Sequence, residues 1–107
     1  MLEIKNGMLN VVITEPRIEG SNHIFEQLVE NDEITEKKNI NKIIFDLINV
    51  EYINSLGIAE FISIIRYYTN LTSGAAKFKF VNVRKEIKKL FSIVELGQLV
   101  EISEGPS

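Results

Sequence analysis

The chain has 107 residues, enough for a single domain that buries a core of its own. Hydrophobic residues make up 45% of it and charged residues 25%, the balance of an ordinary globular protein. The net charge of −3 argues against a protein that binds nucleic acid, because such proteins carry a basic surface that pairs with phosphates. The sequence contains no cysteine, which excludes disulfides, thiolate metal sites and cysteine nucleophiles.

The first third of the chain predicts a hairpin followed by a helix. Two apolar stretches, 2–5 and 8–14, flank Asn6-Gly7, a pair preferred in type I′ turns because both residues tolerate positive φ. Pro16 cannot donate a backbone hydrogen bond, so the second strand should end before it. Ser21 is then the predicted N-cap of a helix, whose buried side carries Ile24, Phe25 and Leu28.

Strands and single helices alternate along the rest of the chain. An apolar run at 42–47 predicts a central strand covered on both faces. A second helix begins near Asn54, and its apolar residues recur every three or four positions until Gly74 can end it in the left-handed conformation. A strand at 77–81 and a last strand at 99–102 enclose a third helix, with an apolar side formed by Ile87, Leu90, Phe91 and Val94.

This order, β-β-α-β-α-β-α-β, predicts one α/β domain. Strands that alternate with single helices pair in parallel through right-handed crossovers. We therefore expect a mixed, mostly parallel sheet, opened by the N-terminal hairpin, with helices packed on it. The domain should span residues 1–103, and residues 104–107 should form a polar tail.

Side chains with chemical reactivity are few. His23 is the single histidine, and without cysteine the chain offers too few ligands for zinc. No P-loop, G-x-G-x-x-G or G-x-S-x-G motif is present. Four carboxylates near the predicted strand ends could support Mg²⁺ or acid–base chemistry, but turn formation and loop solubility explain them more simply: Glu15, Glu19, Asp46 and Glu51. We expect neither an enzyme nor a cofactor.

The expected location is the cytoplasm. The first residues lack the basic-then-apolar layout of a signal peptide. No apolar run approaches the roughly 20 residues that a membrane-spanning helix needs. We therefore expect no contact with a membrane.

Residues 45–57 run from a buried strand through a loop into a helix start. With Asn54 as N-cap, Ser55 is the first helical residue and its hydroxyl is free of the cap. Ile53 and Ile58 then occupy the two positions of a hydrophobic staple. A helix start has unpaired N–H groups and a partial positive charge, so it tolerates a phosphate on Ser55. Gly57 removes bulk beside this serine and would let another molecule approach. A plain capped helix with a glycine for tight packing fits the same spacing equally well.

Residues 44–47 and 50–58 resemble the signature of the STAS domain of bacterial anti-sigma factor antagonists. That signature is a hydrophobic strand ending in Asp-Leu, then an aromatic or apolar pair, then Asp-Ser-Ser/Thr-Gly-Leu-Gly. This sequence departs from it at three positions: Asn54 stands for Asp, Leu56 for the second Ser or Thr, and Ala59 for the second Gly. The resemblance continues through most of the chain, at Arg17-Ile18-Glu19, 78–83, 87–91 and 94–97.

The resemblance implies a regulator that works by partner switching. In the family, the unphosphorylated antagonist binds an anti-sigma factor that is also a serine kinase, which releases the sigma factor. The kinase, which holds ATP and Mg²⁺, phosphorylates the first serine of the motif, here Ser55, and the complex dissociates; a serine phosphatase reverses this. Transcription is thereby regulated without contact with DNA.

The partner surface implied by this resemblance lies around the helix start and the loop 15–22. We expect a monomer or weak dimer. The alternative is a STAS domain that is not switched, acting as a scaffold or as a subunit of a larger signalling or transport complex. The expected contact residues are Glu19, Asn22, Asn54, Leu56, Gly57 and Ile58.

Overall fold

Five strands form the main sheet, in the spatial order β1-β2-β4-β6-β7. The computed structural model describes residues 2–31, 34, 36–93 and 100–105. β1 is antiparallel to β2 and every other neighbouring pair is parallel, which confirms the predicted mixed, mostly parallel sheet. The strands are β1 (Leu2–Lys5), β2 (Met8–Val12), β4 (Lys42–Asp46), β6 (Lys77–Val83) and β7 (Glu101–Glu104).

The N-terminal hairpin has the predicted turn. Asn6 and Gly7 both have positive φ, 53° and 78°, as a type I′ turn requires. β2 ends at Val12, two residues earlier than predicted, and Pro16 follows in the loop. This hairpin forms one edge of the sheet.

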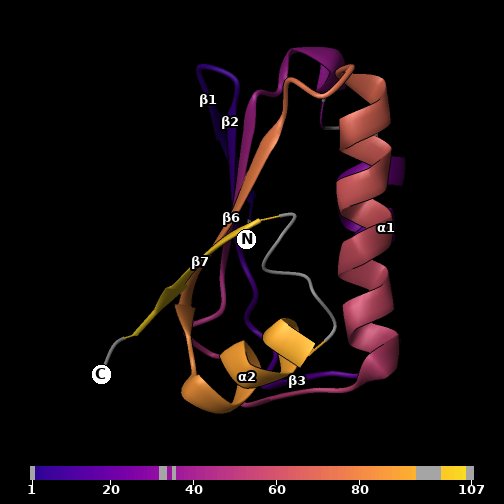
Figure 1. The fold of residues 1–107 in the computed structure, drawn as a ribbon. Coiled ribbons are helices and arrows are strands. Elements are labelled where there is room, and N and C mark those ends of the chain that lie inside the picture. Colours follow the sequence, from indigo (N-terminus) through magenta and orange to yellow (C-terminus); the bar gives the residue numbers. More distant parts are fainter. Residues whose placement is uncertain (1, 32–33, 35, 94–99, 106–107) are drawn as a thin grey trace.

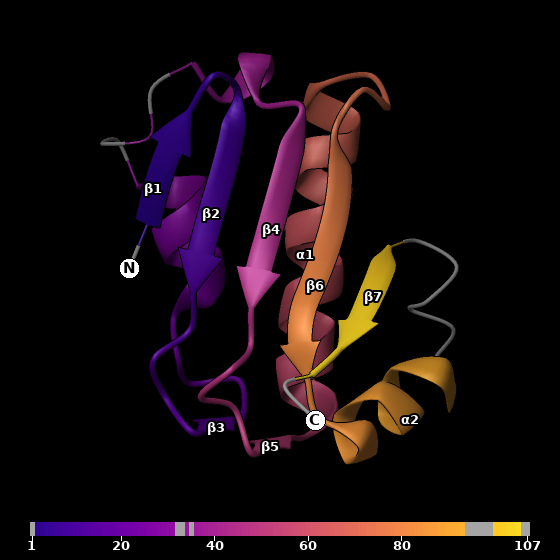
Figure 2. The same cartoon turned by 90° about the vertical axis from the view of Figure 1, so that its left-hand side faces the viewer.

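The long helix α1 (Ser55–Leu71) and the first helical segment lie on the same face of the sheet, as Figures 1 and 2 show. α2 (Lys85–Ile93) lies beside the end of β6. Along β4, Ile43 and Phe45 are buried, whereas Lys42, Ile44 and Asp46 are only half-buried. The prediction that this strand is covered on both faces is therefore wrong: no described helix packs against the second face.

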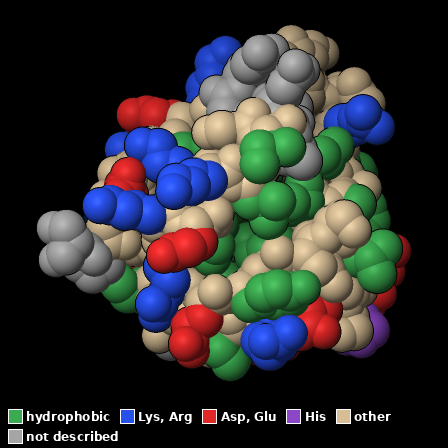
Figure 3. Space-filling model, turned by 60° about the horizontal axis from the view of Figure 1, so that its bottom comes forward, with side chains coloured by type: hydrophobic (Ala, Val, Ile, Leu, Met, Phe, Trp, Pro, Cys, Tyr) green, Lys and Arg blue, Asp and Glu red, His purple; other side chains and the backbone are tan. Residues whose placement is uncertain are grey.

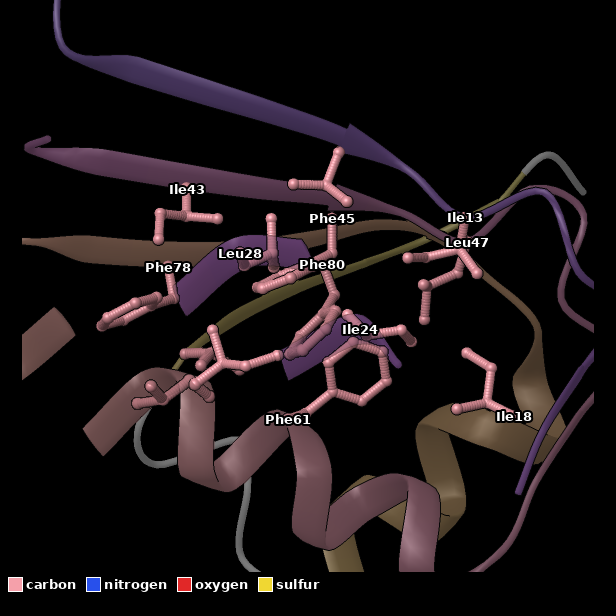
Figure 4. Close-up of a cluster of buried hydrophobic side chains, with 14 of the residues drawn as sticks. Ile13, Ile18, Ile24, Leu28, Ile43, Phe45, Leu47, Phe61, Phe78 and Phe80 are labelled. Carbon is pink, nitrogen blue, oxygen red and sulfur yellow. The ribbon is translucent and has the colours of Figure 1, made fainter. Parts of the chain in front are cut away.

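Aromatic side chains fill the space between the sheet and α1. The rings of Phe45 and Phe80 stack 4.8 Å apart, and Phe61 of α1 meets both rings edge-on, at 5.2 and 5.1 Å (Figure 4). All three side chains are fully buried. Edge-to-face pairs of this kind stabilise by about 0.5–1.5 kcal/mol beyond the burial of their area. They fix α1, and hence its first residue, relative to the sheet.

The first helix begins later than predicted. Ile24 and Phe25 are the first helical residues, and the π-helical segment η1 (Glu26–Glu30) follows. Ser21 is not the N-cap, because His23 has a positive φ of 58° and interrupts the backbone between Ser21 and the helix. Ile24 and Leu28 are nevertheless buried and Phe25 is half-buried, as expected for the inner side.

Two short elements at the ends of the main strands were not predicted. β3 (Arg17–Ile18) pairs in parallel with β5 (Tyr52–Ile53) to form a separate small sheet. The 3₁₀ segment η2 (Lys37–Asn39) precedes β4. None of the helices in the described part of the chain is long and apolar enough to cross a membrane.

The C-terminal half follows the predicted order with shifted ends. β6 continues two residues beyond 81, and Ile87 and Phe91 of α2 are buried as expected. β7 ends at Glu104, one residue beyond the expected end of the domain. Val94, predicted on the apolar side of the third helix, and Leu99, the predicted start of the last strand, lie outside the described residues.

Candidate functional site

The start of α1 is built as the sequence predicts. Asn54 is extended, with φ −104° and ψ −178°, and its side-chain oxygen accepts a hydrogen bond of 3.0 Å from the N–H of Gly57. The carbonyl of Asn54 accepts the first helical bond, from Ile58. Ser55 is therefore the first residue of the helix, and its side chain is exposed. No hydrogen bond to its hydroxyl occurs among the described residues, so the oxygen is available to solvent or to a partner.

The small β3–β5 sheet holds the helix start against the rest of the molecule. The backbone N–H of Asn54 donates to the carbonyl of Ile18 at 3.1 Å. A Cβ added to Gly57 would lie 2.6 Å from that same carbonyl oxygen. The glycine is thus required by a close approach within the chain, and it does not open space for another molecule.

Two of the residues that were expected to contact a partner are buried in the structure. Gly57 is buried against Ile18, and Ile58 is only 4% exposed. Neither residue can contact a partner while the helix start stays packed on β3. Ile53, also 4% exposed, is buried as the hydrophobic staple requires.

Asn22 is also buried, at 8% exposure, because it organises its own loop. Its side-chain amide donates to Glu15 at 2.5 Å and to the carbonyl of Arg17 at 2.9 Å. Its side-chain oxygen accepts from the backbone N–H of Glu19 at 3.0 Å. These bonds use the polar atoms of the side chain inside the loop 15–22, so Asn22 stabilises the loop and has little surface left for a partner.

The residues that remain accessible form what we call the helix-start surface: Arg17, Glu19, Gly20, Tyr52, Ser55 and Leu56. Leu56 is 63% exposed and Tyr52 is 42% exposed, both high values for large apolar side chains. Figure 3 views the molecule from this end and shows hydrophobic side chains across its middle and right, with charged side chains mostly at the left and along the bottom. Of the expected contact residues, Glu19 and Leu56 belong to this surface, while Asn54 is half-buried and uses its oxygen in the cap.

A shallow groove of about 300 Å³ borders this surface along α1. Its floor includes Gly20, which lies so close to the helix that an added Cβ would be 2.7 Å from Cβ of Leu56. Glu60, on the groove wall, accepts the N–H of Phe25 at 3.0 Å and so caps the first helix from α1. The residues lining the groove are Gly20, Phe25, Leu56, Ala59, Glu60 and Ser63.

The charges of the helix-start surface are mostly paired within it. The guanidinium of Arg17 forms an ion pair with Glu19 and lies 4.2 Å from the centre of the Tyr52 ring. His23 is exposed just beyond, and its Nδ1 lies 2.9 Å from a carboxylate oxygen of Glu26. The hydrogen bond to Glu26 and the charge of that carboxylate raise the pKa of His23 above its usual value.

Three of the four carboxylates named from the sequence bind other groups of their loops, while Glu51 is exposed and no contact of its carboxylate is found among the described residues. Asp46 accepts the N–H of Ile48 at 3.0 Å and the side-chain amide of Asn82 at 2.9 Å. Glu15 and Glu19 have the partners described above. Within the described part of the chain, no three acidic or histidine side chains gather closely enough to hold a metal ion. The geometry offers an exposed hydroxyl and an apolar contact surface.

Arg17 and Gly20 lie in the loop 15–22 that was expected at the partner surface but were not named as contact residues, and Tyr52 was not expected there. Arg17 and Tyr52 meet because β3 and β5 pair, and strands of two residues have no periodicity to detect. Gly20 has a φ of 94°, and a glycine followed by Ser-Asn ahead of a helix was the one available signal for a turn there.

The fold is shared with solved structures of several proteins. A protein described as a candidate anti-sigma factor antagonist (tm1081) from Thermotoga maritima aligns with a TM-score of 0.72 and 22% identity, over 99% of this chain and 86% of its own. The anti-sigma factor antagonist SpoIIAA, in its unphosphorylated form, aligns with a TM-score of 0.63 and 14% identity, over 100% of this chain and 88% of its own. No curated protein sequence matches the chain.

The same fold also occurs inside a much longer protein. The murine anion transporter Slc26a9 aligns with a TM-score of 0.74 and 16% identity, over 96% of this chain but 17% of the transporter. A family model described as the STAS domain matches residues 1–105. Because that match spans nearly the whole chain and the fold agrees with it, the chain belongs to the STAS domain family.

Proposed function

We propose that the chain is an anti-sigma factor antagonist, which binds an anti-sigma factor with serine kinase activity and loses that binding when Ser55 is phosphorylated. The observation that carries the proposal is the position of Ser55: exposed, first in α1, and next to Leu56, an exposed apolar side chain. The shared fold of SpoIIAA supports it. In this proposal the kinase supplies ATP and Mg²⁺, and the chain, acting in the cytoplasm, has no catalytic activity of its own.

A phosphate on Ser55 would act on the complex and leave the fold intact. It adds about −1.5 to −2 charges. The helix start stabilises an anion by about 0.3–1 kcal/mol, so α1 should stay folded. A partner that covers Leu56 and Tyr52 would remove water from the phosphate. Arg17, the cation of this surface, is already paired with Glu19, so the buried dianion lacks a matching charge and the complex should dissociate.

The test is to incubate the chain with its cognate anti-sigma factor kinase and ATP, and to map the phosphate by mass spectrometry. We expect one phosphate, on Ser55, and none on Ser55→Ala. Ser55→Asp should weaken kinase binding at least about tenfold, as expected for a buried unpaired charge. Ser92→Asp is the matched control, because Ser92 is an exposed helical serine of α2. A serine phosphatase should remove the phosphate from Ser55. Phosphate on another residue, with Ser55→Ala still modified, would refute the assignment.

The second candidate is a STAS domain that is not switched, acting within a larger signalling or transport complex. Two observations favour it: the likeness to one part of Slc26a9, and Leu56 at the position where the STAS signature has a second Ser or Thr. Both candidates expect Leu56→Ala to weaken partner binding. They differ for Ser55: a scaffold keeps its partner whether position 55 is Ser, Ala or Asp, and takes up no phosphate.

A further inference from the structure

A row of lysines crosses the face of the sheet that the described helices leave open. The strand register places Lys5 opposite Met8, Met8 opposite Lys42, and Lys42 opposite Lys77. Residues paired in this way point to the same side of a sheet. The next residues along the strands, Leu9, Ile43 and Phe78, are buried toward α1, so the row belongs to the opposite face. We call Lys5, Lys42 and Lys77 the lysine row; Figure 2 faces this side of the sheet.

The three lysines form no ion pair among the described residues, although Glu3 and Glu101 lie in the next row of the same face. Lys42 and Lys77 are direct cross-strand partners on neighbouring parallel strands, and like charges placed opposite each other destabilise a sheet. Lys79, one row further along β6, shows the contrast, since its Nζ lies 3.6 Å from a carboxylate oxygen of Glu101. This unpaired positive charge occurs on a chain whose net charge is −3.

Partly exposed aliphatic side chains lie between the lysines and beside them. Met8 stands within the row, and Ile44 follows Lys42 on the same face of β4; both are half-buried. On the same face, Val81 of β6 is half-buried as well. A surface that combines cations with aliphatic groups complements a protein surface that combines carboxylates with apolar side chains.

We propose that the open sheet face is a second interaction surface, which binds an acidic, partly apolar segment of another protein at the lysine row. Phosphate-rich partners fit less well. The three lysines span only about 15 Å at the usual 4.8 Å strand spacing, and electrostatic binding to anionic membranes uses clusters of about 4–8 basic residues. The negative chain also repels nucleic acid at longer range. The lysine row lies at the starts of β4 and β6, whereas the helix-start surface lies beyond the strand ends, so both can be occupied together (Figure 2).

The probe for the test is a short fluorescein-labelled peptide in which Glu alternates with Leu. The wild-type chain should bind the peptide, and the affinity should fall as added salt shortens the Debye length. Backbone amide shifts in NMR spectra should change in β1, β2, β4 and β6 around the lysine row. The double variant Lys42→Glu/Lys77→Glu should bind about tenfold more weakly or worse, because two attractive contacts become repulsive. The matched control is Lys85→Glu/Lys89→Glu, with the same change of charge on exposed residues of α2, and it should bind within about twofold of wild type.

If circular dichroism shows that the charge-reversal variant does not fold, Lys42→Ala/Lys77→Ala replaces it as the test variant. Shifts that map away from the row, no binding of the peptide, or equal weakening in the α2 control would each overturn the proposal. The last measurement is binding to phosphatidylserine vesicles, followed by sedimentation. Retention on vesicles that is lost in Lys42→Glu/Lys77→Glu, without peptide binding, would assign the row to a membrane surface and also overturn it.

Discussion

Gly57 marks the closest approach between α1 and β3, and the packing there decides which residues of the site are exposed. An alanine in a helix is about 1 kcal/mol more favourable than a glycine, so helix propensity alone would favour Gly57→Ala. The added Cβ, however, would lie 2.6 Å from the carbonyl oxygen of Ile18 and 2.9 Å from its Cγ2. A backbone carbonyl that already accepts the N–H of Asn54 cannot give way without disturbing the cap.

We therefore predict that Gly57→Ala lowers the free energy of unfolding by about 1–3 kcal/mol, the usual cost of overpacking, despite its better helix propensity. Urea unfolding followed by circular dichroism measures this. Ala59→Ser, an exposed position in the same helix, is the control and should change stability by less than about 0.5 kcal/mol. If Gly57→Ala were as stable as wild type, β3 would be free to move and the helix start would not be fixed as described.

At the scale of elements, one buried hydroxyl links α1 to the first helix. Tyr68 is fully buried and donates its hydroxyl to the carbonyl of Leu28 at 2.5 Å. Burial raises the pKa of Tyr68 to about 12. In the unfolded chain the phenol loses its proton near pH 10, while the folded chain keeps it until about 12. Between these values the unfolded state binds fewer protons, so stability falls as the pH rises.

We predict two effects of Tyr68→Phe. At pH 7 it should lower the free energy of unfolding by about 1–3 kcal/mol, because the buried carbonyl of Leu28 loses its donor. Between pH 10 and 12 the gap should narrow, because the variant lacks the titrating group and wild type alone loses that contribution. Tyr67→Phe, at the half-buried neighbouring position, is the control. Urea midpoints across this pH range measure both; parallel pH curves for wild type and Tyr68→Phe would contradict the assignment.

Elements with a long periodic pattern of apolar residues could be predicted from the sequence, and elements that depend on contacts between residues far apart in the chain could not. α1 has seventeen residues with a regular apolar stripe, and its cap at Asn54 and exposed Ser55 follow from local rules. Ser21 is a good N-cap by residue type, but the bonds of Asn22 to its own loop and the positive φ of His23 move the helix start. The burial of Gly57 depends on Ile18, which no local pattern brings beside it.

The open face of the sheet was missed for a related reason. The run Ile43-Ile44-Phe45 has no alternation in hydrophobicity and therefore indicates a strand covered on both sides. In the structure Ile44 is half-buried on the open face, opposite Lys79 and next to the row that contains Lys42 and Lys77. The charges of the neighbouring strands, which only the register brings together, define the character of this face.

For the whole molecule, the sheet separates two surfaces. The helix-start surface lies at the end where the parallel strands finish and α1 begins, and the lysine row lies on the open face where β4 and β6 begin (Figures 1 and 2). The stacked rings of Phe45 and Phe80, on the neighbouring strands β4 and β6, belong to a close-packed core, which does not deform gradually. No residue belongs to both surfaces, so a charge change at one should reach the other only weakly.

Effects at the two surfaces should therefore be independent. We predict that Ser55→Asp changes affinity for the acidic peptide by less than about twofold, and that Lys42→Glu/Lys77→Glu changes affinity for the kinase equally little, since distant sites without shared partners behave additively. The variant with all three substitutions should lose as much affinity for the kinase as Ser55→Asp does, and as much affinity for the peptide as Lys42→Glu/Lys77→Glu does. Titrations of the four proteins with both partners form a complete cycle. A coupling of tenfold or about 1.4 kcal/mol would mean that the sheet has a second arrangement that both surfaces select, and the rigid separation of the two would then be wrong.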